Sequence, residues 1–126
     1  MRQAIIDIGT NTCLLLIAEA EIAGEMKVIA DVHAMARLGA GVDKSKQIQP
    51  DAYHRLKNIL LGHRKIIQEQ KVDETIAIAT SAMRDAVNRN EIIQEVKDDT
   101  GFDDILDFRE DSVASEGIAL PFETSY

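Results

Sequence analysis

Hydrophobic and polar positions change their period near residue 50. Before it, the short apolar runs QAIIDI (residues 3–8) and CLLLIAEA (residues 13–20) flank the polar sequence Gly-Thr-Asn-Thr, a pattern typical of two strands joined in a hairpin. Residues 26–38 predict a third strand after a turn at Gly24, and the sequence Gly-Ala-Gly at residues 39–41 ends it. Residues 42–49 predict a polar loop. Three strands joined by short turns predict an antiparallel meander.

After residue 50 the apolar residues recur at helical spacing. Pro50 and Asp51 suit a helix N-terminus, so residues 50–70 predict an amphipathic helix. Further elements are a buried strand at 75–79, a helical turn at 82–86, a helix at 91–100 capped by Asn88 or Asn90 and ended by Gly101, and a fifth strand at 105–108. The order β-β-β-α-β-α-β predicts one α/β domain with a mixed sheet flanked by helices.

Charge and cysteine content narrow the possible functions. The formal net charge of −8 over 126 residues argues against broad nucleic-acid binding, which needs a basic surface. Cys13 is the single cysteine and lies in an apolar run, so we expect a buried thiol rather than a reactive one. No apolar stretch is long enough to span a membrane and no signal peptide is visible, so we expect a cytoplasmic protein.

The first candidate site is the hairpin turn that follows Asp7. The backbone amides of Gly9, Thr10, Asn11 and Thr12 can form a cradle for phosphate oxygens. Asp7 alternates away from its apolar neighbours at the end of a strand, where a carboxylate can hold Mg²⁺ directly or through water. An ordinary β-hairpin turn explains the same residues equally well.

Two further segments are weaker candidates when each is taken alone. A buried strand leads into Thr80, Ser81 and then Arg84, which could receive an anion at a helix start or could be ordinary caps beside a surface ion pair with Asp85. Arg37 precedes the sequence Leu-Gly-Ala-Gly, which lacks the Walker pattern and by itself predicts a turn. The three histidines, His33, His54 and His63, show no metal-ligand spacing.

Taken together, the three segments resemble the exopolyphosphatase / guanosine pentaphosphate phosphohydrolase family. AIIDIGTNTCLLLIAE (residues 4–19) is similar to the family's first phosphate motif, and RLGAGVDKSKQIQPDAYHRL (residues 37–56) to its arginine-glycine loop and long helix. IAIATSAMRDAVNRNEI (residues 76–92) is similar to its Ala-Thr-Ser-Ala-x-Arg segment. The resemblance implies a ribonuclease-H-like fold of the actin-like ATPase and acetate-kinase type. It also implies magnesium-dependent hydrolysis of a phosphoanhydride in polyphosphate or guanosine pentaphosphate.

The same resemblance implies roles for individual residues. Asp7 would hold Mg²⁺ or its water shell. The phosphate-binding residues would be Gly9, Thr10, Asn11, Thr12, Arg37, Ser81 and Arg84. The family places a catalytic base in a Gly-x-Glu-Glu-Ala-like segment, for which Glu116 is the nearest match here, with Glu110 and Asp111 as rivals.

The resemblance covers a core at residues 1–108 and leaves a divergent tail at 109–126. The family's second phosphate motif, Asp-x-Gly-Gly-Gly-Ser, does not occur before Tyr126. We therefore expect the N-terminal part of one phosphatase domain, with low activity as an isolated chain and a tendency to form homo-oligomers through an incomplete sheet. The alternatives are a kinase of the same superfamily and a regulatory module that binds polyphosphate without catalysis.

Overall fold

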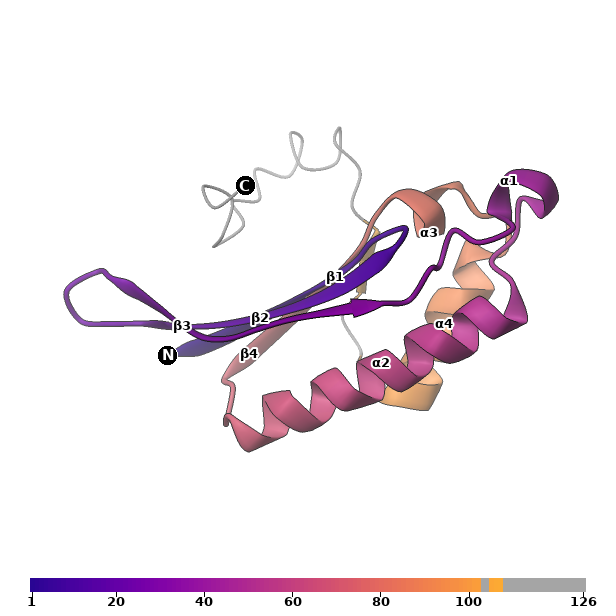
Figure 1. The fold of residues 1–126 in the computed structure, drawn as a ribbon. Helices are drawn as coiled ribbons and strands as arrows, with labels where there is room; N and C mark the ends of the chain where they lie inside the picture. Colours follow the sequence, from indigo (N-terminus) through magenta and orange to yellow (C-terminus); the bar gives the residue numbers. More distant parts are fainter. Residues whose placement is uncertain (103–104, 108–126) are drawn as a thin grey trace.

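The computed structural model describes residues 1–102 and 105–107, in which five strands form one mixed sheet (Figure 1). The strands are β1 (Arg2–Ile8), β2 (Thr12–Ala20), β3 (Met26–Met35), β4 (Glu74–Ala79) and β5 (Ile105–Asp107). Their order across the sheet is β3-β2-β1-β4-β5. β1 pairs antiparallel with β2 and parallel with β4, so the sheet is mixed, as predicted, and its central strand joins the meander to the β-α-β part.

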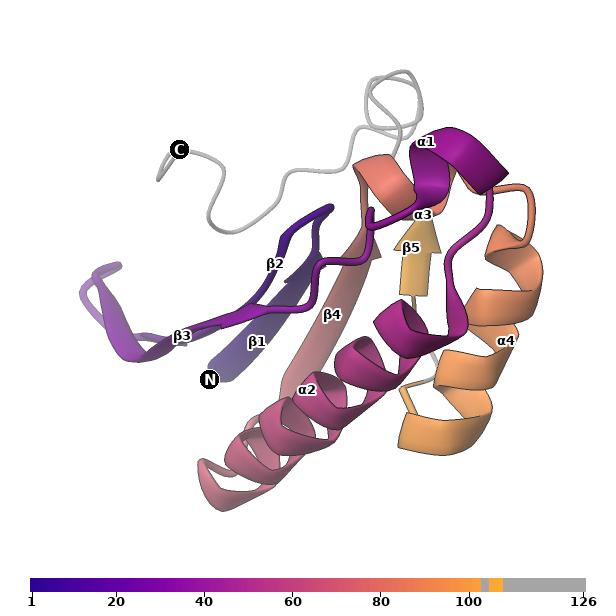
Figure 2. The same cartoon turned by 45° about the vertical axis from the view of Figure 1, so that its right-hand side comes forward.

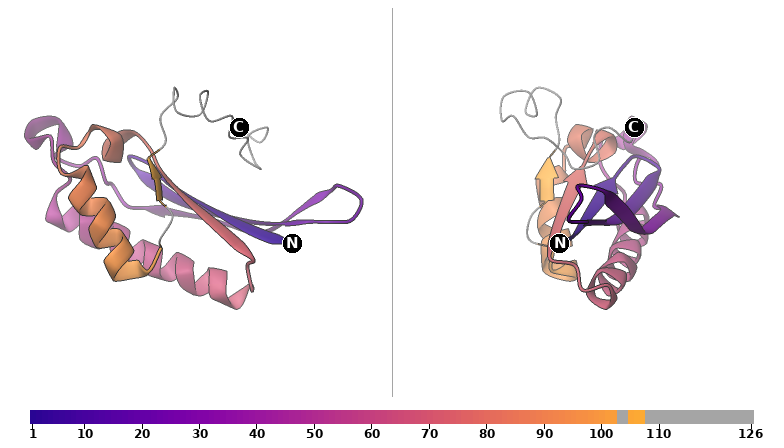
Figure 3. Two further views of the ribbon diagram at one scale, coloured as in Figure 1. Left: turned by 180° about the vertical axis from the view of Figure 1, so that it is seen from behind. Right: turned by 90° about the vertical axis from the view of Figure 1, so that its left-hand side faces the viewer.

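The helices of the described residues are α1 (Val42–Ser45), α2 (Pro50–Glu69), α3 (Ser81–Asp85) and α4 (Arg89–Thr100). Helices α2 and α4 lie side by side over one face of the sheet, as the two views in Figures 2 and 3 show. The main core lies between these layers and includes Ile6, Leu15, Leu56, Leu60 and Val96, each at most 1% exposed. None of the described helices combines the length and the apolar character that crossing a membrane requires.

The segment that follows β3 differs from the prediction. The strand ends at Met35 rather than at residue 38, because Arg37 has a positive φ of 51°, which is incompatible with extended backbone. The predicted loop at 42–49 contains the short helix α1, anchored by buried Val42 and Ile48. Val42 and Ile48 are separated by five polar residues, and two apolar positions give too little periodicity to predict a helix of four residues.

Other predicted elements lie within a few residues of their predicted bounds. Asn88 is the N-terminal cap of α4, but its side chain bonds the backbone of Ile48 instead of capping the helix. Gly101 ends α4 with a left-handed φ of 77°, as expected of a C-terminal glycine. Of the predicted fifth strand, Phe108 lies outside the described residues.

Candidate functional site

The turn between β1 and β2 is closed by one backbone hydrogen bond, from Gly9 N to Thr12 O at 3.0 Å. A Cβ at Gly9 would lie 3.0 Å from the same oxygen, a tight contact that would push the Thr12 carbonyl away by a few tenths of an ångström. The amides of Thr10 and Asn11 donate no hydrogen bond to any residue that the structure describes. Two neighbouring unpartnered amides at a turn are the elements of an anion-binding nest.

The segment after β3 is fixed against this turn by its backbone. Arg37 N donates to Asn11 O and Gly39 N donates to Thr10 O, both at 2.9 Å. A Cβ added at Gly39 would lie 2.5 Å from Thr10 Cγ2, so only glycine allows the approach. The candidate segment that contains Arg37 therefore lies directly beside the β1–β2 turn.

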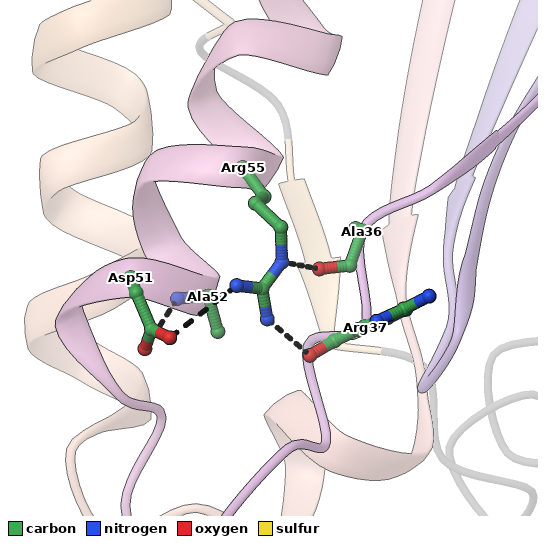
Figure 4. Close-up of polar contacts among 5 residues, drawn as sticks. All are labelled: Ala36, Arg37, Asp51, Ala52 and Arg55. Carbon is green, nitrogen blue, oxygen red and sulfur yellow. Dashed lines mark hydrogen bonds and ion pairs between the residues drawn. The ribbon is translucent and has the colours of Figure 1, made fainter.

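Arg37 has a constrained backbone and an unpartnered side chain. Its N–H bonds Asn11, and its carbonyl accepts hydrogen bonds from Ala40 N (3.1 Å) and from the Arg55 side chain (3.2 Å). Its guanidinium is exposed and forms no hydrogen bond or ion pair with any group that the structure describes. Figure 4 shows the Arg37 side chain directed away from Arg55. A cation held in this way is available to an anion.

The third segment reaches the same end of the sheet through Thr80. Both its amide and its Oγ1 donate to Ile8 O, at 3.1 and 3.3 Å, so the Thr80 side chain, at the N-cap position of α3, holds the end of β1 instead of capping the helix. Ser81 follows as the first residue of α3. Arg84 Nε lies 3.6 Å from Asp85 Oδ1, and both side chains are largely exposed, which is the surface ion pair anticipated as the alternative.

Asp7 carries a buried polar atom without a partner. It pairs with Leu14 and Ile78 in the sheet and lies on the face opposite the main core, with Ile5. Its Oδ1 is buried and accepts no hydrogen bond, and burial raises the pKa of the carboxyl group above its usual 3.8. A divalent cation would offset this desolvation, so the orphaned oxygen fits a magnesium ligand.

The described residues hold no cluster of three or more His, Cys, Asp or Glu side chains able to bind a metal by themselves. This arrangement still fits Mg²⁺, which commonly keeps several waters and takes only one or two carboxylates besides substrate phosphates. The three histidines are not grouped, as predicted: His33 pairs with Asp31 at 2.9 Å, His54 is exposed and His63 is buried. The proposed bases Glu116, Glu110 and Asp111 lie outside the described residues.

Cys13 lies beneath the turn and is fully buried. Burial, with a smaller contribution from the Asp7 charge, raises the pKa of its thiol to about 12. The thiol is therefore protonated and unreactive at neutral pH, as the sequence predicted. The backbone carbonyl of Cys13 lies 3.3 Å from His63 Nε2. Burial lowers the pKa of the His63 imidazole, and the contact with this carbonyl partly opposes the shift.

The sequence did not predict the contacts that two residues, Arg55 and Thr80, make at this end of the sheet. Helical spacing alone places Arg55 on the polar, solvated face of α2, yet its side chain donates to the carbonyls of Ala36 and Arg37. Thr80 was interpreted as a helix cap, yet it bonds β1. Their partners lie 18 to 72 residues away, and helical periodicity carries no signal for such contacts.

Comparison with known proteins identifies the family of this chain. A model of the Ppx/GppA phosphatase family matches residues 16–110, which include Arg37, Ser81 and Arg84 but begin after the β1–β2 turn. The chain is 39% identical over 105 residues to a bifunctional 3-dehydroquinate synthase/phosphatase of Fusobacterium nucleatum, covering 78% of this chain and 16% of that protein. It is 32% identical over 101 residues to exopolyphosphatase 1 of Mycobacterium bovis, covering 80% and 29% respectively.

Solved structures give the same result. A Ppx/GppA family member from Aquifex aeolicus superposes with a TM-score of 0.83 at 30% identity, covering 89% of this chain and 36% of that one. An exopolyphosphatase from Cytophaga hutchinsonii superposes with a TM-score of 0.78 at 30% identity, covering 83% and 33%. The chain thus spans about a third of the solved relatives and has their ribonuclease-H-like, actin-like ATPase fold. It belongs to the Ppx/GppA phosphatase family.

Proposed function

We propose that this chain binds the terminal phosphoryl groups of polyphosphate or guanosine pentaphosphate, as part of a magnesium-dependent phosphoanhydride hydrolase. The observation that carries the proposal is the convergence of unpartnered groups at one end of β1. There the amides of Thr10 and Asn11, the guanidinium of Arg37 and the buried oxygen of Asp7 lack partners among the described residues. Each of these groups suits a phosphate chain and its counterion.

The chemistry of phosphoryl transfer explains why such groups suffice for much of the work. Charge in the transition state spreads over the phosphoryl oxygens, so catalysis depends on positioning and on donors fixed beforehand. The turn supplies two amides whose direction is set by the Gly9–Thr12 hydrogen bond, and Arg37 adds a forked cation. Bound Mg²⁺ would neutralise phosphate charge, with Asp7 holding the ion or its water shell.

Hydrolysis also needs a base to activate water, and we propose Glu116 for this role, with Glu110 and Asp111 as rivals. The family membership and the printed names of the relatives, which include exopolyphosphatases, support a hydrolase. The chain spans 29% of that exopolyphosphatase, so activity of the whole protein is part of the proposal. We expect the 126-residue chain alone to release phosphate slowly.

Thermal unfolding with tripolyphosphate, measured with and without Mg²⁺, tests the proposal. Binding to the folded chain alone raises Tm, and a ligand at 100 times its Kd adds about 2.7 kcal/mol to the free energy of unfolding. We expect the shift to need Mg²⁺ and to exceed the shift given by ATP at the same concentration. No shift with any phosphate chain contradicts the proposal, and a larger shift with ATP favours the kinase alternative.

A phosphate-release assay on the same samples separates catalysis from binding. Release that is lost in Glu116→Gln but kept in Glu110→Gln and Asp111→Asn identifies the base. A Tm shift without release supports the regulatory module instead. Parallel titrations with guanosine pentaphosphate and tripolyphosphate rank the two substrates.

Self-association stays a prediction. Edge strand β3 carries exposed Met26, Val28 and Met35, which gives it the apolar surface that the prediction requires. Light scattering over a concentration series checks it, and Val28→Lys should reduce association while Val87→Lys, at an exposed site outside the sheet, should not.

A further inference from the structure

Arg37 occupies backbone geometry that an arginine does not adopt without support. Its φ of 51° lies in the left-handed region, where a side chain crowds the backbone. Such a conformation persists only when surrounding contacts determine it. The contacts here are the hydrogen bonds of its amide to Asn11 and of its carbonyl to Ala40 and Arg55.

Arg55 supplies the support that comes from outside the loop. It projects from the second turn of α2, and its Nε donates to Ala36 O at 2.8 Å while its Nη2 donates to Arg37 O at 3.2 Å (Figure 4). Its Nη1 lies 3.4 Å from Asp51 Oδ2, one helical turn earlier. The planar fork of a guanidinium can meet two successive carbonyls at once, which the single ammonium of lysine cannot reproduce.

The two arginines therefore have different tasks. The donors of Arg55 face backbone carbonyls and Asp51, whereas the guanidinium of Arg37 has no partner in the described part of the chain. Helix α2 is anchored by buried Leu56 next to Arg55, so the fork rests on a fixed element. We infer that Arg55 is a positioning residue, which acts on phosphate binding only by fixing the backbone from which Arg37 reaches the phosphate. This inference rests on the proposed function.

Calorimetric titration of the full chain with tripolyphosphate in Mg²⁺ tests this coupling in four proteins: unsubstituted, Arg37→Ala, Arg55→Lys and the double variant. Arg37→Ala should weaken binding by about 10- to 100-fold, the effect of removing one hydrogen-bonding partner of a charged group. Arg55→Lys keeps the net charge and should weaken binding by about 3- to 10-fold. Because Arg55 acts through Arg37, the double variant should bind no more weakly than Arg37→Ala alone.

Hydrogen exchange supplies a readout that is independent of binding. In Arg55→Lys the amides of Arg37, Gly39 and Ala40 should exchange faster, since the loop loses its anchor. Arg64→Lys is the matched control on the same helix, because Arg64 Nη1 donates to Thr100 O, at the end of α4. It should change neither tripolyphosphate binding nor exchange in the loop.

The possible failures are distinguishable. If Arg37→Ala binds as well as the unsubstituted chain, the phosphate role of Arg37 is wrong and the inference falls with it. If Arg37→Ala weakens binding but Arg55→Lys does not, only the positioning role is overturned. Independent losses that multiply in the double variant, or unchanged exchange in the loop, also overturn it.

Discussion

Polar groups at the two ends of β1 differ in whether they have partners within the protein. At the start of the strand, Arg2 N donates to Asp73 Oδ2 at 2.8 Å, Asp73 N donates to Arg2 O at 2.9 Å, and the Arg2 side chain binds Gln70 O at 2.7 Å and lies 3.5 Å from Glu19. At the other end, Asp7 has a buried oxygen without a partner and Arg37 has a guanidinium without one, within the described residues.

This difference distinguishes polar groups that hold the fold together, at one end of the strand, from groups that we propose bind phosphate at the other end. Buried or clustered polar groups are normally satisfied inside a protein, and the Arg2 end follows that rule. The buried Asp7 oxygen without a partner costs free energy, whereas the exposed Asn11 amide and Arg37 guanidinium nearby are solvated and free to bind an external partner. An arginine that bonds its own protein and an arginine that bonds none should respond differently to the same substitution.

The largest effect on stability is expected at Gly39, where the segment after β3 packs tightly against the β1–β2 turn. Gly39→Ala places a Cβ 2.5 Å from Thr10 Cγ2, and such overpacking costs about 1–3 kcal/mol. We expect a lower free energy of unfolding in urea and weaker tripolyphosphate binding, because the loop must move away from the turn. Adding Thr10→Ser removes the clashing methyl group and should restore stability. Gly62→Ala, on an exposed face of α2 with nothing within 4 Å, should instead raise the free energy of unfolding by about 0.5–1 kcal/mol.

Exchanging the two arginines for alanine compares the ends directly. Arg2→Ala removes a charged donor from Gln70 and should cost about 1–2 kcal/mol in urea unfolding, discounted for partial exposure, with no change in tripolyphosphate binding. Arg37→Ala should change stability by less than about 0.5 kcal/mol while weakening binding. Equal effects of both substitutions on stability and binding would remove the distinction.

Asp7→Asn should stabilise the metal-free chain, by up to about 1 kcal/mol, and abolish the Mg²⁺-dependent part of tripolyphosphate binding. Because burial raises the folded pKa of Asp7, its protonated form stabilises the fold below the unfolded value of 3.8, and that contribution is lost as pH rises through the folded pKa. Urea unfolding from pH 3 upwards, without Mg²⁺, should show this loss in the unsubstituted chain and less of it in Asp7→Asn. Glu25→Gln, which alters an exposed side chain with no hydrogen bond or ion pair among the described residues, is the control. A destabilised Asp7→Asn contradicts the idea of a frustrated carboxylate.

The smallest effect on stability should come from His63, a buried titratable residue whose Nε2 lies near the Cys13 carbonyl, at the start of β2. Its folded pKa is lowered by burial, so the unfolded chain binds the proton more readily below the ordinary value of 6.5. Stability should therefore fall as pH decreases from 6.5 through the folded pKa. His63→Gln should flatten this dependence in thermal unfolding, whereas His54→Gln, which alters an exposed residue, should not.

Sequence predicted the fold better than the contacts of the site. The apolar runs of β1 and β2 and the spacing of Leu56 and Leu60 in α2 are local signals, and the elements formed as expected. The positive φ of Arg37 and the hydrogen bonds of the Arg55 guanidinium depend on contacts with another segment of the chain. Neither could be predicted from the residue type. Thr80 was placed at the right end of the right strand, but its partner depends on how β1 and β4 align.

The bond from Thr80 to Ile8 also bears on how the site assembles during folding. It joins residues 72 positions apart, across a parallel pairing that needs a helical crossover, whereas the β1–β2 turn closes locally. Contacts between residues so distant in sequence form late, since the intervening chain loses entropy before they are made. We therefore expect the hairpin to form before β4 docks, and the proposed phosphate site to be complete only after β4 has docked.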